Sequence, residues 1–96
     1  MHAAIRTFSG AGAMKLVDLL EGRKSEVESI IRSVKGFVSY TMIRTADVAT
    51  TVTVCQDKAG TDESSRLARE WIGKNAPDLG VSPPTIAEGS ISLHLK

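Results

Sequence analysis

The sequence has few of the residues that build disulfides, nucleic-acid surfaces or membrane spans. Its single cysteine, Cys55, excludes an intrachain disulfide and fits a reducing compartment. The 12 lysines and arginines nearly balance 11 acidic residues, so the charge that binds nucleic acid is missing. The N-terminus shows no signal-peptide pattern, and no run approaches about 18 apolar residues. We therefore expect a cytoplasmic protein that binds neither membranes nor nucleic acid.

The chain length sets the size of the domain. The 96 residues fit one domain, residues 1–96, and leave no room for two. A chain this short buries only a modest core. Pairing with a second copy is one way to bury more surface without adding sequence.

Apolar spacing predicts two helices. Apolar residues three, four and seven apart predict one long helix over residues 13–34, and Gly36 suits the left-handed position just past its end. Residues 57–60 are expected to form a loop. A second helix is expected over residues 61–75, with Thr61 as its N-cap and Pro77 beyond its end.

Four strands complete the order strand, helix, hairpin, helix, strand. They are expected at residues 2–8, 37–45, 48–56 and 85–95, and the second and third form a hairpin around Ala46-Asp47. This order predicts a ferredoxin-like α+β fold of the βαββαβ kind. It has a four-stranded antiparallel sheet in the order 4-1-3-2, with both helices on one face.

A sheet with helices on one face leaves its other face uncovered. Alternation assigns Val52, Val54, Ile91, Leu93 and Leu95 to the helix side. The far side then receives Ala4, Arg6, Phe8, Thr51, Thr53, Cys55, Ser90, Ser92 and His94. Such a mixed face favours a homodimer whose two sheets face each other around a cavity, and the alternative is an exposed face on a monomer.

Two stretches resemble a known superfamily. The step Lys35-Gly36-Phe37-Val38-Ser39-Tyr40 and the order of elements resemble the dimeric α+β-barrel proteins. Residues 52–64, followed by Ala68-Arg69-Glu70-Trp71-Ile72, look similar to antibiotic biosynthesis monooxygenase-like proteins and their uncharacterised bacterial relatives. The resemblance implies a homodimer with a ligand pocket between the sheet and the helices of each protomer.

The resemblance also bears on cofactors. Characterised relatives include cofactor-independent monooxygenases that act on polycyclic aromatic substrates, and haem-degrading enzymes. The haem-degrading branch uses an Asn on the first strand, a Trp, and a His on the second helix. This chain has Trp71 but neither of the other two, so we expect no haem and no other cofactor.

Five side chains are candidates for lining the pocket: Arg6, Tyr40, Cys55, Trp71 and His94. A buried Arg6 needs an anion, either a ligand or a carboxylate across the dimer. Trp71 either fills the core or forms a wall for an aromatic ligand, and its N–H needs a partner in both cases. Tyr40 suits either donation to a ligand oxygen or capping of the sheet. Cys55 fits a small buried hydrophobe better than a nucleophile.

The histidines decide between chemistry and binding. His94 is a candidate general base, because the imidazole side chain can take up a proton in catalysis. His2 and His94 are expected near each other, but a third ligand is missing, so no metal site is predicted.

Three functions stay open. The first is a cofactor-independent monooxygenase-like enzyme that binds a compact aromatic or polyketide-like molecule. The second is a non-catalytic ligand-binding or stress-associated dimer, and the third is a structural module packed without a cavity. A His94 that points into a cavity favours the enzyme, and a His94 that points to solvent favours the second reading.

Overall fold

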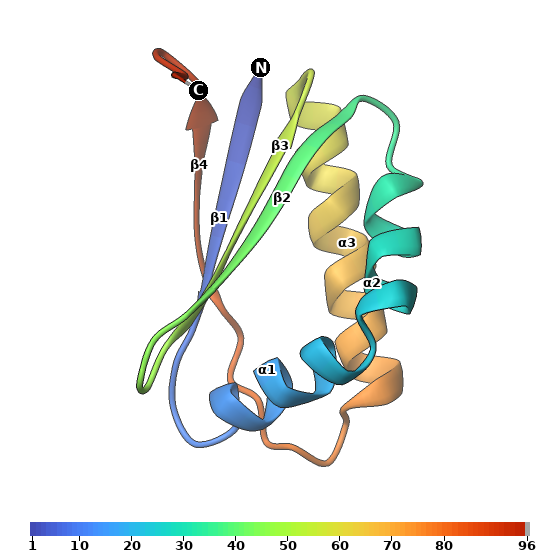
Figure 1. Ribbon diagram of the computed structural model, residues 1–96, viewed down its shortest axis with the longest axis vertical. Coiled ribbons are helices and arrows are strands. Elements are labelled where there is room, and N and C mark those ends of the chain that lie inside the picture. Colours follow the sequence, from blue (N-terminus) through green and yellow to red (C-terminus); the bar gives the residue numbers. More distant parts are fainter. Residues whose placement is uncertain (96) are drawn as a thin grey trace.

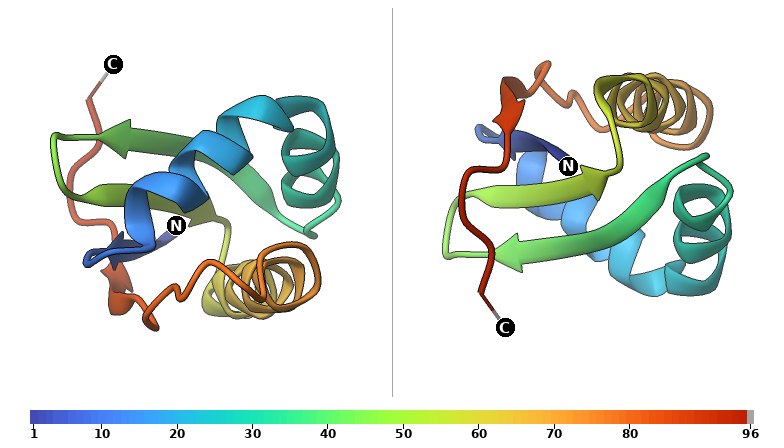
Figure 2. Two further views of the ribbon diagram at one scale, coloured as in Figure 1. Left: turned by 90° about the horizontal axis from the view of Figure 1, so that it is seen from below. Right: turned by 90° about the horizontal axis from the view of Figure 1, so that it is seen from above.

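The computed structural model describes residues 1–95 and has one sheet and three helices (Figure 1). In chain order the elements are β1 (His2–Phe8), α1 (Ala13–Gly22), α2 (Lys24–Arg32), β2 (Phe37–Arg44), β3 (Ala49–Cys55), α3 (Lys58–Asn75) and β4 (Thr85–Ser90). The strands are antiparallel in the order β2-β3-β1-β4, and the helices lie together on one face of the sheet (Figure 2). The predicted ferredoxin-like α+β fold and strand order are confirmed. Within residues 1–95, no helix is long and apolar enough to cross a membrane.

The prediction of one long first helix is wrong. The helix breaks at Arg23, whose φ of −125° and ψ of 37° lie outside the helical region. The break lets α1 cross below the sheet while α2 runs beside β2 (Figure 1). Gly22 weakens the helix at this point because glycine costs about 1 kcal/mol relative to alanine inside a helix. Apolar spacing continues across the break, so periodicity alone does not reveal it.

The start of α3 also differs from the prediction. Asp57 is the N-cap, and its carboxylate accepts the backbone N–H of Gly60 at 3.2 Å. Thr61 lies inside the first turn, where its hydroxyl donates to the carbonyl of Lys58 at 3.0 Å. Both side chains are competent caps, and the earlier one begins the helix. The predicted end at Asn75 is confirmed, as is the left-handed Gly36, whose φ is 79°.

The predicted faces of β1 and β3 are reversed. Arg6 pairs in register with Thr51, and Ala4 with Thr53, so these residues share one face. That face lies toward the helices, because the Arg6 guanidinium reaches α3. The helix side therefore receives Ala4, Arg6, Phe8, Thr51, Thr53 and Cys55, and the opposite side receives Val52 and Val54. Alternation shows which residues share a face but not which face the helices cover, and a one-residue shift reverses the assignment.

The last strand is shorter than predicted. β4 ends at Ser90, which shares the helix side with its partner His2 rather than facing away. Ile91 donates its N–H to the carbonyl of Met1 at 3.0 Å, and this is the last backbone hydrogen bond of the segment to the sheet among residues 1–95. Residues 92–95 therefore leave the sheet, and Leu93 and Leu95, expected on the helix side, are 75% and 81% exposed.

The face away from the helices is uncharged. Every residue that the strands place there is apolar, glycine, serine or threonine: Ala3, Ile5, Thr7, Ser39, Thr41, Ile43, Thr50, Val52, Val54, Thr85, Ala87 and Gly89. We call this set the free sheet face. Ile5 and Ile43 are 40% and 47% exposed on it. Half of these residues are apolar and none is charged, so the free sheet face is suited to contact with another protein surface.

The helix side of the sheet carries the core. Its buried residues are Phe8, Ala13, Leu16, Val17, Ala49, Trp71 and Ala76. Gly60 lets α3 approach the end of β3, since a Cβ there would lie 2.6 Å from the Cβ of Cys55 and 3.0 Å from the carbonyl oxygen of Lys35. The first turn of α3 therefore depends on a residue without a side chain.

Two glycines of α3 test this close contact. We expect Gly60→Ala to lower the free energy of unfolding by about 1–3 kcal/mol, because the added methyl group overpacks the contact with Cys55. Gly73→Ala is the control, since a Cβ there meets nothing within 4 Å. Its better helix propensity should raise stability by about 0.5–1 kcal/mol. Urea unfolding measures both changes, and equal effects would contradict the packing described.

Candidate functional site

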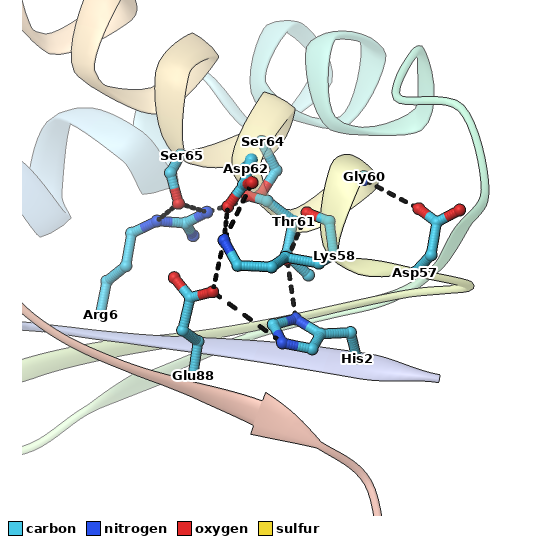
Figure 3. Close-up of polar contacts among 10 residues, drawn as sticks. All are labelled: His2, Arg6, Asp57, Lys58, Gly60, Thr61, Asp62, Ser64, Ser65 and Glu88. Carbon is cyan, nitrogen blue, oxygen red and sulfur yellow. Dashed lines mark hydrogen bonds and ion pairs between the residues drawn. The ribbon is translucent and has the colours of Figure 1, made fainter.

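The centre of the helix side is built around Arg6. The side chain is only 2% exposed. Its Nε donates to Ser65 at 3.2 Å, and its Nη2 donates to Ser65 at 2.9 Å and to Ser64 (Figure 3). Its Nη1 donates to Thr51 at 3.4 Å and to Thr53 at 3.0 Å. Every N–H of the guanidinium thus has a hydroxyl acceptor. These hydroxyls come from β3 and α3, so Arg6 links the sheet to the helix.

The charge of Arg6 is not neutralised by these contacts. Its partners are neutral, and no carboxylate within residues 1–95 forms an ion pair with it. Burial lowers the pKa of Arg6, while the more distant Glu88 acts in the opposite direction. The guanidinium nevertheless stays protonated in proteins. An unpaired buried cation is costly, and an anion that reached it would gain a counter-charge in a poorly solvated site.

A small cavity lies between the sheet and the helices. Its volume is about 40 Å³, which holds a few water molecules. Arg6, Thr51 and Tyr40 supply its polar lining. Its other walls are Phe8, Leu20, Val27, Ile30, Ile31, Leu67, Ala68, Trp71 and Ile72.

A larger cleft adjoins this cavity on the side of β2. This β2–α2 cleft has a volume of about 490 Å³ and shares Leu20, Val27, Ile31 and Tyr40 with the cavity. Pockets that bind small molecules usually have about 300–1,000 Å³. The cleft is therefore large enough for a small ligand, and the cavity lies next to it.

Tyr40 stands where the cleft meets the cavity. Burial raises the pKa of its phenol, and the charge of Arg6 and a hydrogen bond with Thr51 only partly counteract this. The phenol is therefore protonated near neutral pH. It can donate a hydrogen bond to a ligand oxygen in surroundings that are otherwise mostly apolar.

Trp71 is a fixed wall of the cavity. Its side chain is 8% exposed, and its indole N–H donates to the carboxylate of Glu26 at 3.0 Å. This hydrogen bond lowers the pKa of Glu26. The guanidinium of Arg23 lies over the ring, 5.3 Å from the centroid. The core role and the pocket-wall role expected for Trp71 therefore coincide.

The other two candidates lie outside the cavity. Cys55 is fully buried beneath Gly60, and burial raises the pKa of its thiol, so it is a core residue rather than a nucleophile. His94 is exposed in the segment beyond β4. It lies outside the residues that line the cavity and the cleft.

His2 belongs to a separate polar cluster at the end of the sheet. Its Nδ1 lies 2.9 Å from Thr61 Oγ1 and its Nε2 lies 3.9 Å from Glu88, which also pairs with Lys58 at 3.2 Å (Figure 3). No group of three or more His, Cys, Asp or Glu residues within residues 1–95 is arranged to hold a metal.

The sequence interpretation missed the serines that hold Arg6. Ser64 and Ser65 lie in the middle of α3, and Ser64 is one heptad before Trp71, on the same stripe. A buried hydroxyl on the apolar stripe of a helix needs a polar partner from another element. The contact between Arg6 and the serines could therefore have been predicted from two signals: an arginine inside a strand, and Ser64 at heptad spacing from Trp71.

Comparisons with known proteins find the same fold. No protein-family model and no curated protein matches the chain by sequence. Among solved structures, a monooxygenase of Streptomyces coelicolor, from the gene ActVA-Orf6 and in complex with nanaomycin D, is 26% identical with a TM-score of 0.63. That match covers 99% of this chain and 90% of the other.

Two further structures extend the comparison. SnoaB, a cofactor-independent oxygenase from Streptomyces nogalater, is 15% identical with a TM-score of 0.64, and the match covers 98% of this chain and 95% of the other. A dimeric ferredoxin-like protein from an uncultured marine organism is 10% identical with a TM-score of 0.69, covering 99% and 97%. The chain thus has the fold of the dimeric α+β-barrel, antibiotic biosynthesis monooxygenase-like proteins. This fold is shared by cofactor-independent oxygenases and by proteins of unknown function.

Tyr40 is the only tyrosine, so its ionisation can be followed directly. We expect the phenolate absorbance of the folded protein to appear at a higher pH than in the unfolded chain, whose phenol titrates near pH 10. Because the unfolded chain loses this proton first, stability should fall as the pH rises above about 10. Spectrophotometric titration in native buffer and in denaturant measures the shift. Coinciding titration curves would show that Tyr40 is solvated rather than buried.

Proposed function

We propose that this protein is a homodimer that binds a small aromatic or polyketide-like molecule in the β2–α2 cleft, with one polar end of the ligand in the cavity. The observation that carries the proposal is the buried Arg6, which faces an apolar cavity together with the protonated Tyr40 and has no carboxylate partner within residues 1–95. A cation and a phenolic donor among apolar walls suit an aromatic ligand whose oxygen carries or gains negative charge.

The candidate activity is that of a cofactor-independent monooxygenase. A phenolic ligand would lose its hydroxyl proton, and Arg6 and Tyr40 would stabilise the resulting anion. The electron-rich ring carbon would then react with dioxygen. A ring C–H becomes a ketone, the phenol becomes the second carbonyl of a quinone, and the other oxygen atom leaves as water. Support comes from the similarity to two oxygenases and from the cavity itself.

A second candidate is a non-catalytic ligand-binding or stress-associated dimer. Among residues 1–95, no His, Asp or Glu lines the cavity to take the proton, and the exposed His94 lies apart from it. The one carboxylate of the cleft wall in that range, Glu28, is held by Arg32 at 2.7 Å. This favours binding without turnover, because a general base must reach the proton that it removes. The two candidates share one pocket and differ only in chemistry.

Dimerisation through the free sheet face is part of the proposal. That face is uncharged, carries Ile5 and Ile43 in the open, and is covered by none of the described helices. Burying it against a second copy would enlarge the small core of each chain. One of the similar solved structures is described as a dimeric ferredoxin-like protein.

Ile5 tests the dimer. We expect Ile5→Glu to give a monomer, because a carboxylate in the middle of an apolar interface has no partner. Ile86→Glu is the matched control, since Ile86 is similarly exposed, at 48% against 40%, but pairs with Arg6 on the helix side. Sedimentation at micromolar concentration measures both. A monomeric wild type, or equal behaviour of the two variants, would rule the interface out.

Val27 tests the pocket. We expect 1-naphthol to bind the wild type, and Val27→Trp to weaken binding at least about tenfold, or about 1.4 kcal/mol. The indole would fill the junction of the cleft and the cavity. Leu93→Trp, in the exposed segment beyond β4, is the control. Calorimetry measures the affinity, and unchanged binding to Val27→Trp would place the ligand elsewhere.

An oxygen electrode then separates the two candidate functions. The monooxygenase would be supported if the wild type consumes oxygen with 1-naphthol and Tyr40→Phe lowers the rate of uptake about tenfold or more. Binding without oxygen uptake would support the non-catalytic reading.

A further inference from the structure

We propose that the groove between α3 and β4 binds the carboxylate of an aromatic or other apolar acid, with Arg69 and Ser65 as the groups that contact it. This inference deepens the proposed function and rests on it, because it assigns a ligand class to a groove beside the same cavity. The groove shares lining residues with the same cavity, and its positive charge narrows the ligand class to an acid.

The shape of this α3–β4 groove suits a small molecule. Its volume is about 380 Å³. Ser65, Arg69 and Ile72 form one wall, since spacings of three and four place them on one face of α3. The opposite wall consists of Ile86 on β4 and the loop that leads to it, which runs below the sheet in Figure 1. The groove shares Arg6, Phe8, Ala68 and Ile72 with the cavity, so the two spaces adjoin.

The arginines are distributed unevenly between the groove and the rest of the surface. Four form ion pairs with carboxylates: Arg23, Arg32, Arg44 and Arg66. The remaining two, Arg6 and Arg69, have no carboxylate partner within residues 1–95, and both line this groove. In the described part of the chain, the groove wall contains no Asp or Glu. The groove therefore carries positive charge that nothing in the described structure neutralises.

Ser65 contacts Arg6 and lies one helical turn before Arg69 on α3. Its oxygen accepts two N–H groups of Arg6, at 3.2 and 2.9 Å (Figure 3). Its own hydroxyl hydrogen has no acceptor among residues 1–95, so it can be donated into the groove. A hydroxyl that accepts bonds from a cation is a stronger donor. Arg69, one turn further along α3, presents the planar guanidinium that binds a carboxylate with two parallel hydrogen bonds.

The walls indicate what the carboxylate is attached to. Phe8, Ile72 and Pro84 provide apolar surface beside Arg69. An apolar acid would satisfy these walls and the charge together. A neutral aromatic molecule would leave both arginines unpaired, and a strongly hydrated anion such as inorganic phosphate would gain nothing from the apolar walls.

A pair of probes with the same ring system tests the inference. We expect 2-naphthoate to bind the wild type and its Kd to rise about tenfold in Arg69→Gln. The neutral 2-naphthalenemethanol should bind both proteins equally. Arg66→Gln is the matched control, because Arg66 lies on the same helix but pairs with Glu63 and Glu70 outside the groove. Calorimetry measures affinity, and amide chemical shifts of Val81, Ser82 and Ile86 locate the ligand.

The outcomes separate this inference from the proposed function. The groove is refuted if 2-naphthoate binds Arg69→Gln as well as it binds the wild type, or if Arg66→Gln weakens binding equally. If either of these results is found and 1-naphthol still binds in a manner sensitive to Val27→Trp, the groove is refuted and the proposal for the cleft stands. Conversely, Arg69-dependent binding of 2-naphthoate that Val27→Trp does not change, together with no binding of 1-naphthol, supports the groove and refutes the cleft.

Discussion

The guanidinium of Arg6 is the group on which the interior arrangement depends. It lies on a central strand, and hydroxyls of β3 and α3 hold it in place without neutralising it. An arginine in this position accounts for three features together: the threonines that face the helices, the serines on the apolar stripe of α3, and the cavity beside them. A buried cation with neutral partners is costly for a small domain. In the proposed function, an anion bound beside Arg6 would offset this cost.

The two faces of the sheet serve different purposes. The helix side contains the core, the cavity and the two openings, the β2–α2 cleft and the α3–β4 groove. The free sheet face has no charge and is suited to another copy of the chain. Because β1 and β3 alternate between these faces, residues next to each other in sequence serve separate functions. Ile5 belongs to the proposed dimer interface and Arg6 to the proposed binding site.

The site resembles a binding pocket more clearly than a catalytic centre. The polar lining of the cavity includes a cation and a protonated phenol, which stabilise negative charge but do not remove a proton. Among residues 1–95, the one carboxylate on the cleft wall, that of Glu28, is paired with Arg32. In a cofactor-independent reaction with oxygen, the ligand itself supplies the electrons, so ionisation of the ligand is the step that the protein must assist. Chemistry at this site therefore requires a ligand acidic enough to ionise beside Arg6. The same positive charge makes an organic acid the natural class of ligand for the adjoining groove.

The sequence by itself determined the order of elements, the hairpin and the end of α3, because these follow from local periodicity and from the positions of glycine and proline. It also determined the strand order, because there are few ways to connect four antiparallel strands. It also identified Arg6, Tyr40 and Trp71, since a charged or large polar-tipped side chain inside a strand or an apolar stripe is conspicuous. Only the tertiary structure decided which face the helices cover, where the first helix bends at Arg23 and that His94 lies outside the pocket. Those outcomes depend on contacts between distant segments, such as Arg6 with Ser65, and alternation within one strand carries no information about them.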